Sequence, residues 1–406
     1  MKANLNPVIF CLIMLNPFCQ AFSQWSLSGN FGSTYVGSVM ANGDELYAGT
    51  SFGIFRSDNN GLNWVQINSG LGNNLFVQTL SSKDNFIFAG TSSGGFNYSD
   101  NKGAFWTQSN QGLGQLNIRV LITDSDNVYA GCIFAGIFRS TNDGLNWSRF
   151  GLGEGDLLYT LSYNETNFFV GLNGAIYRSS NNGANWVLAY NGLTNLDVRT
   201  IVQSGNKTYC GTYGGGVFVS ENNGVLWTSA SAGLTELRIL TLTPIGNDLF
   251  AGTYGGGIFY YNSSAGSWTQ KNQGTPDTVI ASIAVKDEFV FAGSSSGKVW
   301  KRPLSEIITG ISGTGNNVSE DFQLYQNYPN PFNPQTAISF YLPERNFTSL
   351  KIFDALGKEI SEIYSGDLPE GKHTINWSAE SHPSGVYFYS LKSGHYSETK
   401  KLILLK

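Results

Sequence analysis

Short runs of β-branched and aromatic residues, separated by Gly and Asn, fill most of the chain between residues 24 and 303. In residues 198–231 the runs VRTIVQS, TYCGT, VFVSE and WTSAS are separated by GNK, YGGG and NNGVL. Apolar runs of this length, bounded by turn residues, are typical of strands joined as hairpins. Four strands in so short a segment leave no room for a helix, so the pattern predicts an all-β fold.

A small-Gly-small signature recurs in what the pattern predicts to be the second strand of each unit. Successive signature glycines are 41, 41, 40, 40, 41 and 41 residues apart. This period is typical of four-stranded propeller blades. The sequence therefore predicts a seven-bladed β-propeller over residues 24–303. The signature glycines are Gly49, Gly90, Gly131, Gly171, Gly211, Gly252 and Gly293.

A Trp opens the predicted fourth strand in six repeats, whereas the seventh repeat stops after KVWKR and lacks that strand. The segment QWSLSGNFGS around Trp25 aligns with NWVQINSGLG around Trp64, 39 residues later. We predict that the N-terminal strand completes the seventh blade, closing the ring and removing a free sheet edge. The aligned tryptophans are predicted to be structural and buried between sheets: Trp25, Trp64, Trp106, Trp147, Trp186, Trp227 and Trp268.

The turn before Trp64 reads Ser57-Asp58-Asn59-Asn60-Gly61-Leu62-Asn63, and its Ser-x-Asn-x-Gly-x-x-Trp order recurs from Ser99, Ser140, Ser179 and Ser220. This order resembles the Asp-box of the bacterial-neuraminidase-repeat superfamily, which includes sialidases, sortilin-type receptors and photosystem II assembly factors. Here Asn replaces the family's Asp, and either residue can hydrogen-bond its own turn. The resemblance covers about residues 25–303 and implies the architecture. It carries no activity, because Asp-boxes lie away from family active sites.

Both ends of the chain differ from the repeats. Residues 1–23 contain Lys2, the apolar run VIFCLIML and the cleavage-like Ala21-Phe22-Ser23, which predicts a signal peptide. Residues 304–321 are rich in Gly, Ser and Asn and predict a linker. Residues 322–406 predict a small immunoglobulin-like β-sandwich.

Four segments of this last domain resemble the type A sorting domain of type IX secretion. They are residues 327–334 (NYPNPFNP), 354–357 (DALG), 384–387 (SGVY) and the basic-apolar tail 400–406. The resemblance implies export through the periplasm and secretion or display at the cell surface, with residues 322–406 engaging the secretion machinery. The alternative is an ordinary carbohydrate-binding or fibronectin-like sandwich.

Composition narrows the classes of partner and cofactor. Charged residues make up 13% of the chain, the net charge is −5 and no basic block is present, so we expect no nucleic-acid partner. No apolar run is long enough to cross a membrane, so we do not expect an integral membrane protein. After signal removal only Cys132 and Cys210 remain, and we expect neither a disulfide nor a metal site. We also expect no cofactor and a monomeric protein.

Candidate chemistry is sparse in the repeats. All three His residues lie after residue 321, which excludes a Ser-His-Asp or Cys-His site in the propeller. Twelve residues before their signature glycines stand Arg119, Tyr159 and Arg199, which form an arc able to hold an anion or glycan if this position faces the central channel. Each Arg could instead pair with a neighbouring acid. The candidate ligand-binding set is Arg119, Tyr159, Arg199, Phe52, Phe134, Tyr213 and Tyr254.

Two functions remain open: a secreted binding or scaffold protein that recognises a glycan or protein, and a secreted glycoside hydrolase. The second needs two carboxylates about 5 to 9 Å apart, and the sequence alone does not decide whether the protein is an enzyme. Acids in the first-to-second turns are expected to be solvated, among them Glu45, Asp124, Asp126 and Asp248. Acids on the same face as the candidate ligand-binding set are Glu154, Asp156, Asp197, Glu236 and Asp277.

Overall fold

The computed structural model describes residues 24–152, 155–308, 323–327, 329–355, 357–394 and 396–405. In these residues the regular elements are strands and one short 3-10 helix, η1 (Leu304–Glu306), so the predicted all-β class is confirmed. The chain divides into two compact units at residues 309 and 310. The predicted signal peptide (1–23) and residues 309–321 of the predicted linker lie outside the described residues. The linker's first residues, 304–308, include η1.

The first unit consists of antiparallel four-stranded sheets, seven of them between residues 26 and 303, here numbered as blades. Blades 1 to 3 are β2 (Val36–Asn42), β3 (Glu45–Thr50), β4 (Gly53–Ser57), β5 (Val65–Gln66); β6 (Val77–Lys83), β7 (Phe86–Thr91), β8 (Phe96–Ser99), β9 (Thr107–Gln108); and β10 (Ile118–Thr123), β11 (Val128–Cys132), β12 (Gly136–Ser140), β13 (Ser148–Gly151). Blades 4 to 6 are β14 (Leu158–Tyr163), β15 (Phe168–Leu172), β16 (Ile176–Ser179), β17 (Val187–Leu188); β18 (Val198–Ser204), β19 (Lys207–Thr212), β20 (Gly216–Ser220), β21 (Thr228–Ser229); and β22 (Ile239–Ile245), β23 (Asp248–Thr253), β24 (Ile258–Asn262), β25 (Ser267–Gln270). Blade 7 is β26 (Ile280–Lys286), β27 (Phe289–Ser294), β28 (Lys298–Pro303) and β1 (Ser26–Asn30).

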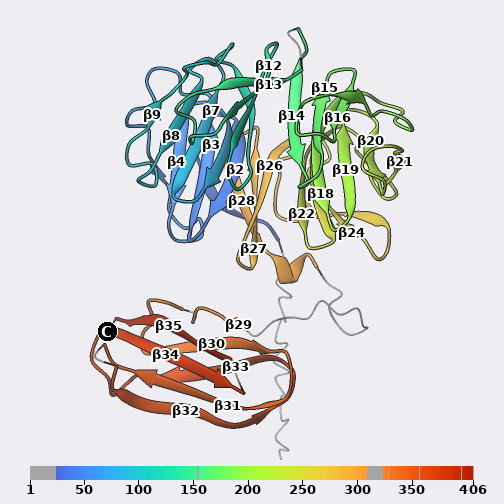
Figure 1. The fold of residues 1–406 in the computed structure, drawn as a ribbon. Helices are drawn as coiled ribbons and strands as arrows, with labels where there is room; N and C mark the ends of the chain where they lie inside the picture. The colour runs from blue at the N-terminus through green and yellow to red at the C-terminus, as the bar shows by residue number, and fades with distance from the viewer. Residues whose placement is uncertain are drawn as a thin grey trace, which may run out of the picture. The chain divides into compact units, whose positions relative to one another are not determined.

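The blades form a closed ring. The innermost strand of each blade contacts the innermost strands of its two neighbours, and β26 contacts β2. In Figure 1 the orange β26 stands beside the blue β2. The N-terminal β1 pairs with β28, with Ser26 opposite Lys301 and Asn30 opposite Lys298. The predicted propeller, closed by the N-terminal strand, is therefore confirmed.

The signature glycine of each blade lets the next blade approach. A Cβ atom added to Gly49 would lie 2.7 Å from Val77, the first residue of the next inner strand. Gly293 of blade 7 has the same relation to Val36 of blade 1, again at 2.7 Å. A side chain at these positions would push the sheets apart, which explains why the repeat keeps Gly in a strand that is otherwise fully buried.

Each Ser–Asn–Gly turn is held by its own side chains. In blade 1 the Ser57 hydroxyl accepts a hydrogen bond from the Gly61 N–H at 2.9 Å and donates to Asn59 Oδ1 at 3.0 Å. Asn59 Oδ1 also accepts from the Asn63 N–H at 3.0 Å. The same bonds recur in the turns that begin at Ser99, Ser140, Ser179 and Ser220. Only an acceptor oxygen is needed at the Asn position, so the Asn side chain is sufficient to hold the turn.

The repeated Trp joins neighbouring blades through its indole N–H. Trp227 Nε1 donates to the Ala189 carbonyl of the preceding blade at 2.7 Å, and Trp25 Nε1 donates to the Lys271 carbonyl at 2.5 Å. Equivalent bonds come from Trp64, Trp106, Trp147 and Trp268. Trp186 is the exception, because its buried Nε1 has no partner.

The prediction that every Trp is buried is wrong for two positions. Trp25, Trp106, Trp147, Trp227 and Trp268 are at most 6% exposed, whereas Trp64 and Trp186 are only half-buried. Phe150, in the last strand of blade 3, stands edge-on to Trp186, with ring centroids 6.3 Å apart. Phe31 has a similar relation to Trp64, at 5.5 Å. In both places a neighbouring aromatic ring shares the space between the sheets.

The C-terminal unit is a β-sandwich, as predicted. One sheet has the order β29 (Gln323–Leu324), β30 (Gln335–Leu342), β33 (Gly371–Ser378), and the other β32 (Glu359–Leu368), β31 (Asn346–Phe353), β34 (Gly385–Ser393), β35 (Tyr396–Leu404). Alternate residues of β30 are buried, the pattern of a strand with one face on a core. The core includes Phe340, Leu350, Tyr389 and Leu402, all fully buried.

Candidate ligand-binding site

A row of aromatic rings and guanidinium groups crosses blades 4, 5 and 6 at the start of their inner strands. The Arg199 guanidinium carbon lies 3.8 Å from the ring centre of Tyr159 and 4.8 Å from that of Tyr213. The Tyr213 and Tyr254 rings meet edge-on at 5.8 Å, and Arg238 lies 5.1 Å from the Tyr254 ring centre. We call these five residues the aromatic–arginine row. Cation–π contacts of this kind hold the side chains in place while leaving ring surface accessible.

Each arginine of the row has its own carboxylate. Arg199 donates to both oxygens of Asp197, at 2.6 and 2.8 Å, and Arg238 donates to both oxygens of Glu236. The hydrogen bond from Arg238 lowers the pKa of Glu236. The two pairs are fork-like and planar, and their charges cancel within the row. From the sequence, each Arg could instead pair with a neighbouring acid. Arg199 does so with Asp197.

Arg119 differs from Arg199. Its Nη1 donates to the neutral Gln78 Oε1 at 3.2 Å, and no carboxylate among the described residues lies within ion-pair distance. Arg119 is close enough to the hydroxyls of Tyr35 and Tyr159 to oppose the rise in their pKa that burial causes. The charges of Arg119 and Arg199 thus both act on Tyr35 and Tyr159, whereas the structure shows no contact that joins Arg119 to Tyr159 or Arg199 among the described residues.

The remaining candidates lie on turns between second and third strands. Phe52 and Phe134 are 59% and 55% exposed, and no contact in the structure joins either ring to the aromatic–arginine row. The Phe134 backbone has φ +63° and is bonded to Asp156 through its N–H. Tyr254 is 44% exposed and Tyr213 is half-buried. The structure thus gathers Tyr159, Arg199, Tyr213 and Tyr254, and leaves Phe52 and Phe134 apart.

Two acids of this face, Glu236 and Asp277, have partners that favour the charged form. Burial acts to raise the pKa of Asp277, but hydrogen bonds from Trp300 and Ser296 outweigh it and hold the pKa below its usual value. The hydrogen bond from Arg238 likewise lowers the pKa of Glu236. A glycosidase general acid needs the opposite shift. Asp156 is exposed, and Glu154 lies outside the described residues.

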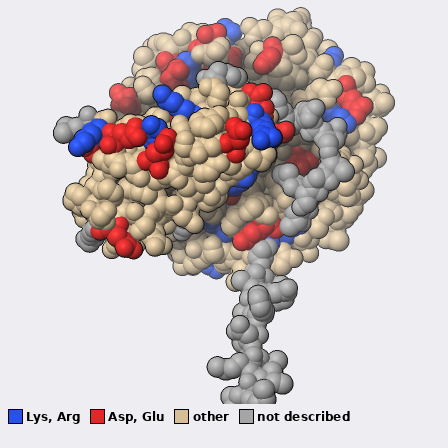
Figure 2. Space-filling view, turned by 90° about the horizontal axis from the view of Figure 1, so that it is seen from below, with Lys and Arg blue, Asp and Glu red and all other residues tan. Residues whose placement is uncertain are grey.

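The acids of the first-to-second turns were expected to be solvated, and for several this is wrong. Glu45 is 7% exposed and bonded by the Tyr47 hydroxyl. Asp248 accepts bonds from Tyr260 and Ser263. These acids stabilise their own blades, because hydroxyl groups of the same blade donate hydrogen bonds to their carboxylates. Figure 2 shows acidic and basic side chains interspersed on a surface that is mostly uncharged.

Other expectations concern metals, thiols and membranes. Cys132 and Cys210 are free and buried, and burial raises the pKa of both thiols. Within the described part of the chain, His, Cys, Asp and Glu nowhere gather in a group of three that could hold a metal ion. In the same residues, no helix has the length and apolarity needed to cross a membrane.

Arg238 was missed by sequence reasoning. The repeat predicts the channel-facing position twelve residues before each signature glycine, where blade 6 has Leu240. Arg238 lies two residues earlier, and the loop before β22 carries it to Tyr254. The spacing acid-x-Arg, shared by Asp197–Arg199 and Glu236–Arg238, is the signal that would have found it.

Comparisons with known proteins agree with both units. The family model for the secretion system C-terminal sorting domain matches residues 326–405. Curated proteins gave no match. Among solved structures, YCF48 from Cyanidioschyzon merolae is similar, with a TM-score of 0.58 and 10% identity over 70% of this chain and 99% of that chain. A structure titled YCF48 bound to D1 peptide gives 0.60 and 11%, over 70% and 97%.

A third similar structure includes more of this chain. PorZ of Porphyromonas gingivalis, described as an essential bacterial surface component of the type-IX secretion system, has a TM-score of 0.52 and 16% identity. The match covers 91% of this chain and 59% of PorZ. At such identities the likeness shows the fold alone. The chain is a β-propeller protein with a secretion system C-terminal sorting domain, exported by the type IX route to the cell surface or the medium.

Proposed function

We propose that the propeller is an extracellular glycan-binding module and that residues 322–406 bring it to the cell exterior through the type IX machinery. The observation that carries the proposal is the aromatic–arginine row, in which three neighbouring blades present Tyr159, Tyr213 and Tyr254 around Arg199 and Arg238. We further propose that the Ser–Asn–Gly turns are Asp-boxes in which Asn has replaced Asp.

The chemistry of the row suits a sugar. Ring faces stack on the apolar faces of pyranoses, and the Asp197–Arg199 and Glu236–Arg238 pairs offer planar donors and acceptors for hydroxyl groups. Because each pair is neutral as a unit, the row favours a hydroxyl-rich ligand over a highly charged one. Arg119 adds one unpaired cation beside Tyr159, which favours a glycan with an occasional acidic residue.

A peptide ligand is the second candidate, and one comparison favours it. The similar propeller YCF48 has been solved with a D1 peptide bound. Tyrosines and arginines are also the residues on which protein interfaces most often depend. The experiment below therefore includes peptides as well as glycans.

The test is binding of the secreted protein to arrayed glycans and peptides, with released sugar read in the same wells. We expect glycan binding without release, abolished in a Tyr213→Ala/Tyr254→Ala variant and in an Arg119→Ala/Arg199→Ala variant. Phe105→Ala, which removes an exposed ring from a Ser–Asn–Gly turn, is the control and should bind normally. Peptide binding alone would replace the glycan by a protein partner. Released sugar would point to a hydrolase and to Asp197, Glu236 and Asp277.

A further inference from the structure

Four junctions between blades are bridged on the side of the Ser–Asn–Gly turns by a cationic side chain in the described residues. Between blades 1 and 2, Arg56 donates to the Lys102 carbonyl at 3.0 Å and the Lys102 ammonium pairs with Glu45. Between blades 2 and 3, Lys83 pairs with Asp143 at 2.7 Å. Lys102 and Asp143 occupy the same fourth position of their turns.

Two further junctions follow this rule. Between blades 4 and 5, Arg178 donates to the Asn223 carbonyl at 2.8 Å. Between blades 7 and 1, Lys301 donates to the Asn60 carbonyl at 2.9 Å, and its ammonium lies 3.8 Å from the ring centre of Phe289. The junction between blades 7 and 1 thus shows what fills such a place: an ammonium over an aromatic ring, held by a turn carbonyl.

The junction between blades 3 and 4 also has a fourth turn residue and a third-strand arginine, but no hydrogen bond joins them in the described residues. Asn182 stands at the fourth position of its turn, and Arg139 is the counterpart of Arg178. No hydrogen bond joins Arg139 to Asn182 in the described structure, and the Arg139 guanidinium lies instead over Phe150, 5.4 Å from the ring centre. The position taken by Lys83 in blade 2 and Lys286 in blade 7 is occupied in blade 3 by Asp124, so the sign of the charge is reversed.

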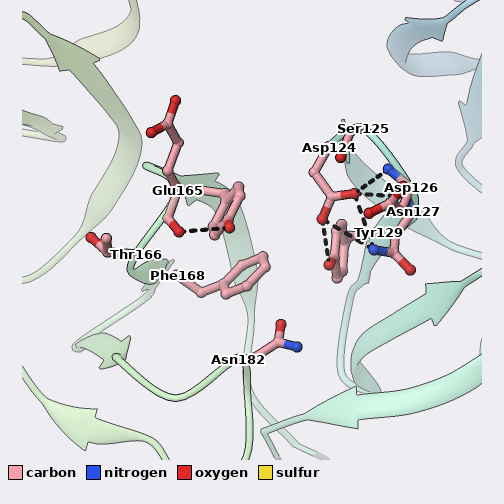
Figure 3. Close-up of a pocket in the computed structure, with 10 residues that line it drawn as sticks. Asp124, Ser125, Asp126, Asn127, Tyr129, Glu165, Thr166, Phe168 and Asn182 are labelled. Carbon is pink, nitrogen blue, oxygen red and sulfur yellow. Dashed lines mark hydrogen bonds between the residues drawn. The ribbon is translucent and has the colours of Figure 1, made fainter.

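A hollow of about 550 Å³ opens at this junction, shown in Figure 3. Aromatic rings pack beneath it: Tyr129 and Phe168, each 1% exposed, have ring centroids 5.0 Å apart, and Phe168 stacks on the half-buried Tyr163 at 4.4 Å. The ten lining residues include three acids and no base. They are Asp124, Ser125, Asp126, Asn127, Tyr129, Tyr163, Glu165, Thr166, Phe168 and Asn182.

The three acids of the hollow differ in their exposure and in their hydrogen bonds. Asp124 accepts hydrogen bonds from the Tyr129 hydroxyl, at 2.8 Å, and from Asn127, and these bonds keep its pKa low although burial acts to raise it. Its charge therefore stays in the wall at neutral pH. Asp126 and Glu165 are exposed at the rim, and no side-chain hydrogen bond or ion pair in the structure occupies either carboxylate. A concave surface of one charge sign, with a low-dielectric floor, concentrates ions of the opposite sign.

We infer that this hollow is a second binding site, on the face opposite the aromatic–arginine row, for the alkylammonium side chain of a lysine from a partner polypeptide. The methylene arm lies on the half-buried Tyr163, and the ammonium lies next to the Asn182 carbonyl and the rim acids, as the Lys301 ammonium lies next to the Asn60 carbonyl between blades 7 and 1. A bare metal ion fits less well, because Asp124, Asp126 and Glu165 do not form a group that could hold one.

The inference is tested by calorimetric titration of the full secreted chain with Nα-acetyl-lysine methylamide, with the Nε-acetylated analogue as the uncharged control. We expect millimolar-range binding of the first probe and none of the second. The Asp126→Asn/Glu165→Gln variant should bind roughly tenfold more weakly. Asp44→Asn, which removes an exposed acid from the equivalent turn of blade 1, should leave binding unchanged.

A second variant closes the site from within. Lys102 adopts φ +59° at the fourth turn position and Asn182 adopts φ +53°, so Asn182→Lys fits the backbone and supplies the missing ammonium. It should abolish probe binding and raise the melting temperature. No binding by the wild-type chain, equal binding of both probes, or unchanged binding by Asn182→Lys would each overturn the inference. Binding of calcium in place of the lysine probe would overturn it as well.

Discussion

Blade 7 and the junction between blades 3 and 4 differ in an unexpected direction. The chain is interrupted at the seam, where β1 pairs with β28 inside blade 7, yet blade 7 is held tightly: Trp25 is 2% exposed, its Nε1 and backbone N–H both reach blade 6, and Lys301 reaches blade 1. The chain is continuous between blades 3 and 4, yet Trp186 is half-buried and its Nε1 has no partner. Matched side chains, rather than covalent continuity, determine how firmly two blades join.

The largest expected effect comes from opening the seam. A chain that begins at residue 31 loses β1 and the buried Trp25, and we expect unfolding free energy to fall by more than about 4 kcal/mol relative to a chain that begins at residue 24, since a large core side chain and a paired strand are both removed. Denaturant unfolding followed by Trp fluorescence measures the difference. Equal midpoints would contradict closure of the ring by β1.

The next effect compares two tryptophans. Trp227→Ala removes a side chain that is 1% exposed and should cost about 3–5 kcal/mol. Trp186→Ala should cost less than half as much, because that ring is half-buried and makes no indole hydrogen bond. Thermal and urea unfolding of the two variants provide the measurement. Similar losses would mean that the two junctions are equally tight.

A gentler substitution isolates the indole N–H. Trp227→Phe leaves the Ala189 carbonyl without its donor and should cost about 1–2 kcal/mol beyond the loss of ring area. Trp186→Phe removes a buried donor that has no partner, so the corresponding cost should be close to zero. The quantity to compare is the difference in unfolding free energy between the Phe variants, and a larger loss at position 186 would refute the assignment.

The smallest effect is a pH dependence at the loose junction. The pKa of Asp124 is lowered in the folded protein, so its contribution to stability is complete above the unfolded-state pKa of about 4 and is lost as pH falls through the lower folded value. Asp124→Asn should therefore cost about 1 kcal/mol at pH 7. Melting curves of both proteins should converge towards acidic pH, and a constant offset would show that the carboxylate charge is not involved.

Much of the architecture could be predicted because the repeat is encoded locally. The signature glycine, the Ser–Asn–Gly turn and the Trp each determine one contact, and the position of Trp25 was enough to predict the seam. The half-exposure of Trp186 depends on Phe150 in the preceding blade, which a comparison of aligned positions does not reveal. Arg238 was missed because its guanidinium reaches Tyr254 from a loop, where strand periodicity no longer tells which way a side chain points.

The pairing of β1 with β28 also affects the order in which the propeller can assemble. Ser26 and Lys301 are partners separated by 275 residues, so β1 cannot pair until nearly the whole propeller sequence is available. Contacts of such long range form late, after the entropy of a long loop has been overcome. Until β1 pairs with β28, the edge of the seventh blade has unpaired backbone groups, and such an edge is a template for pairing with another chain.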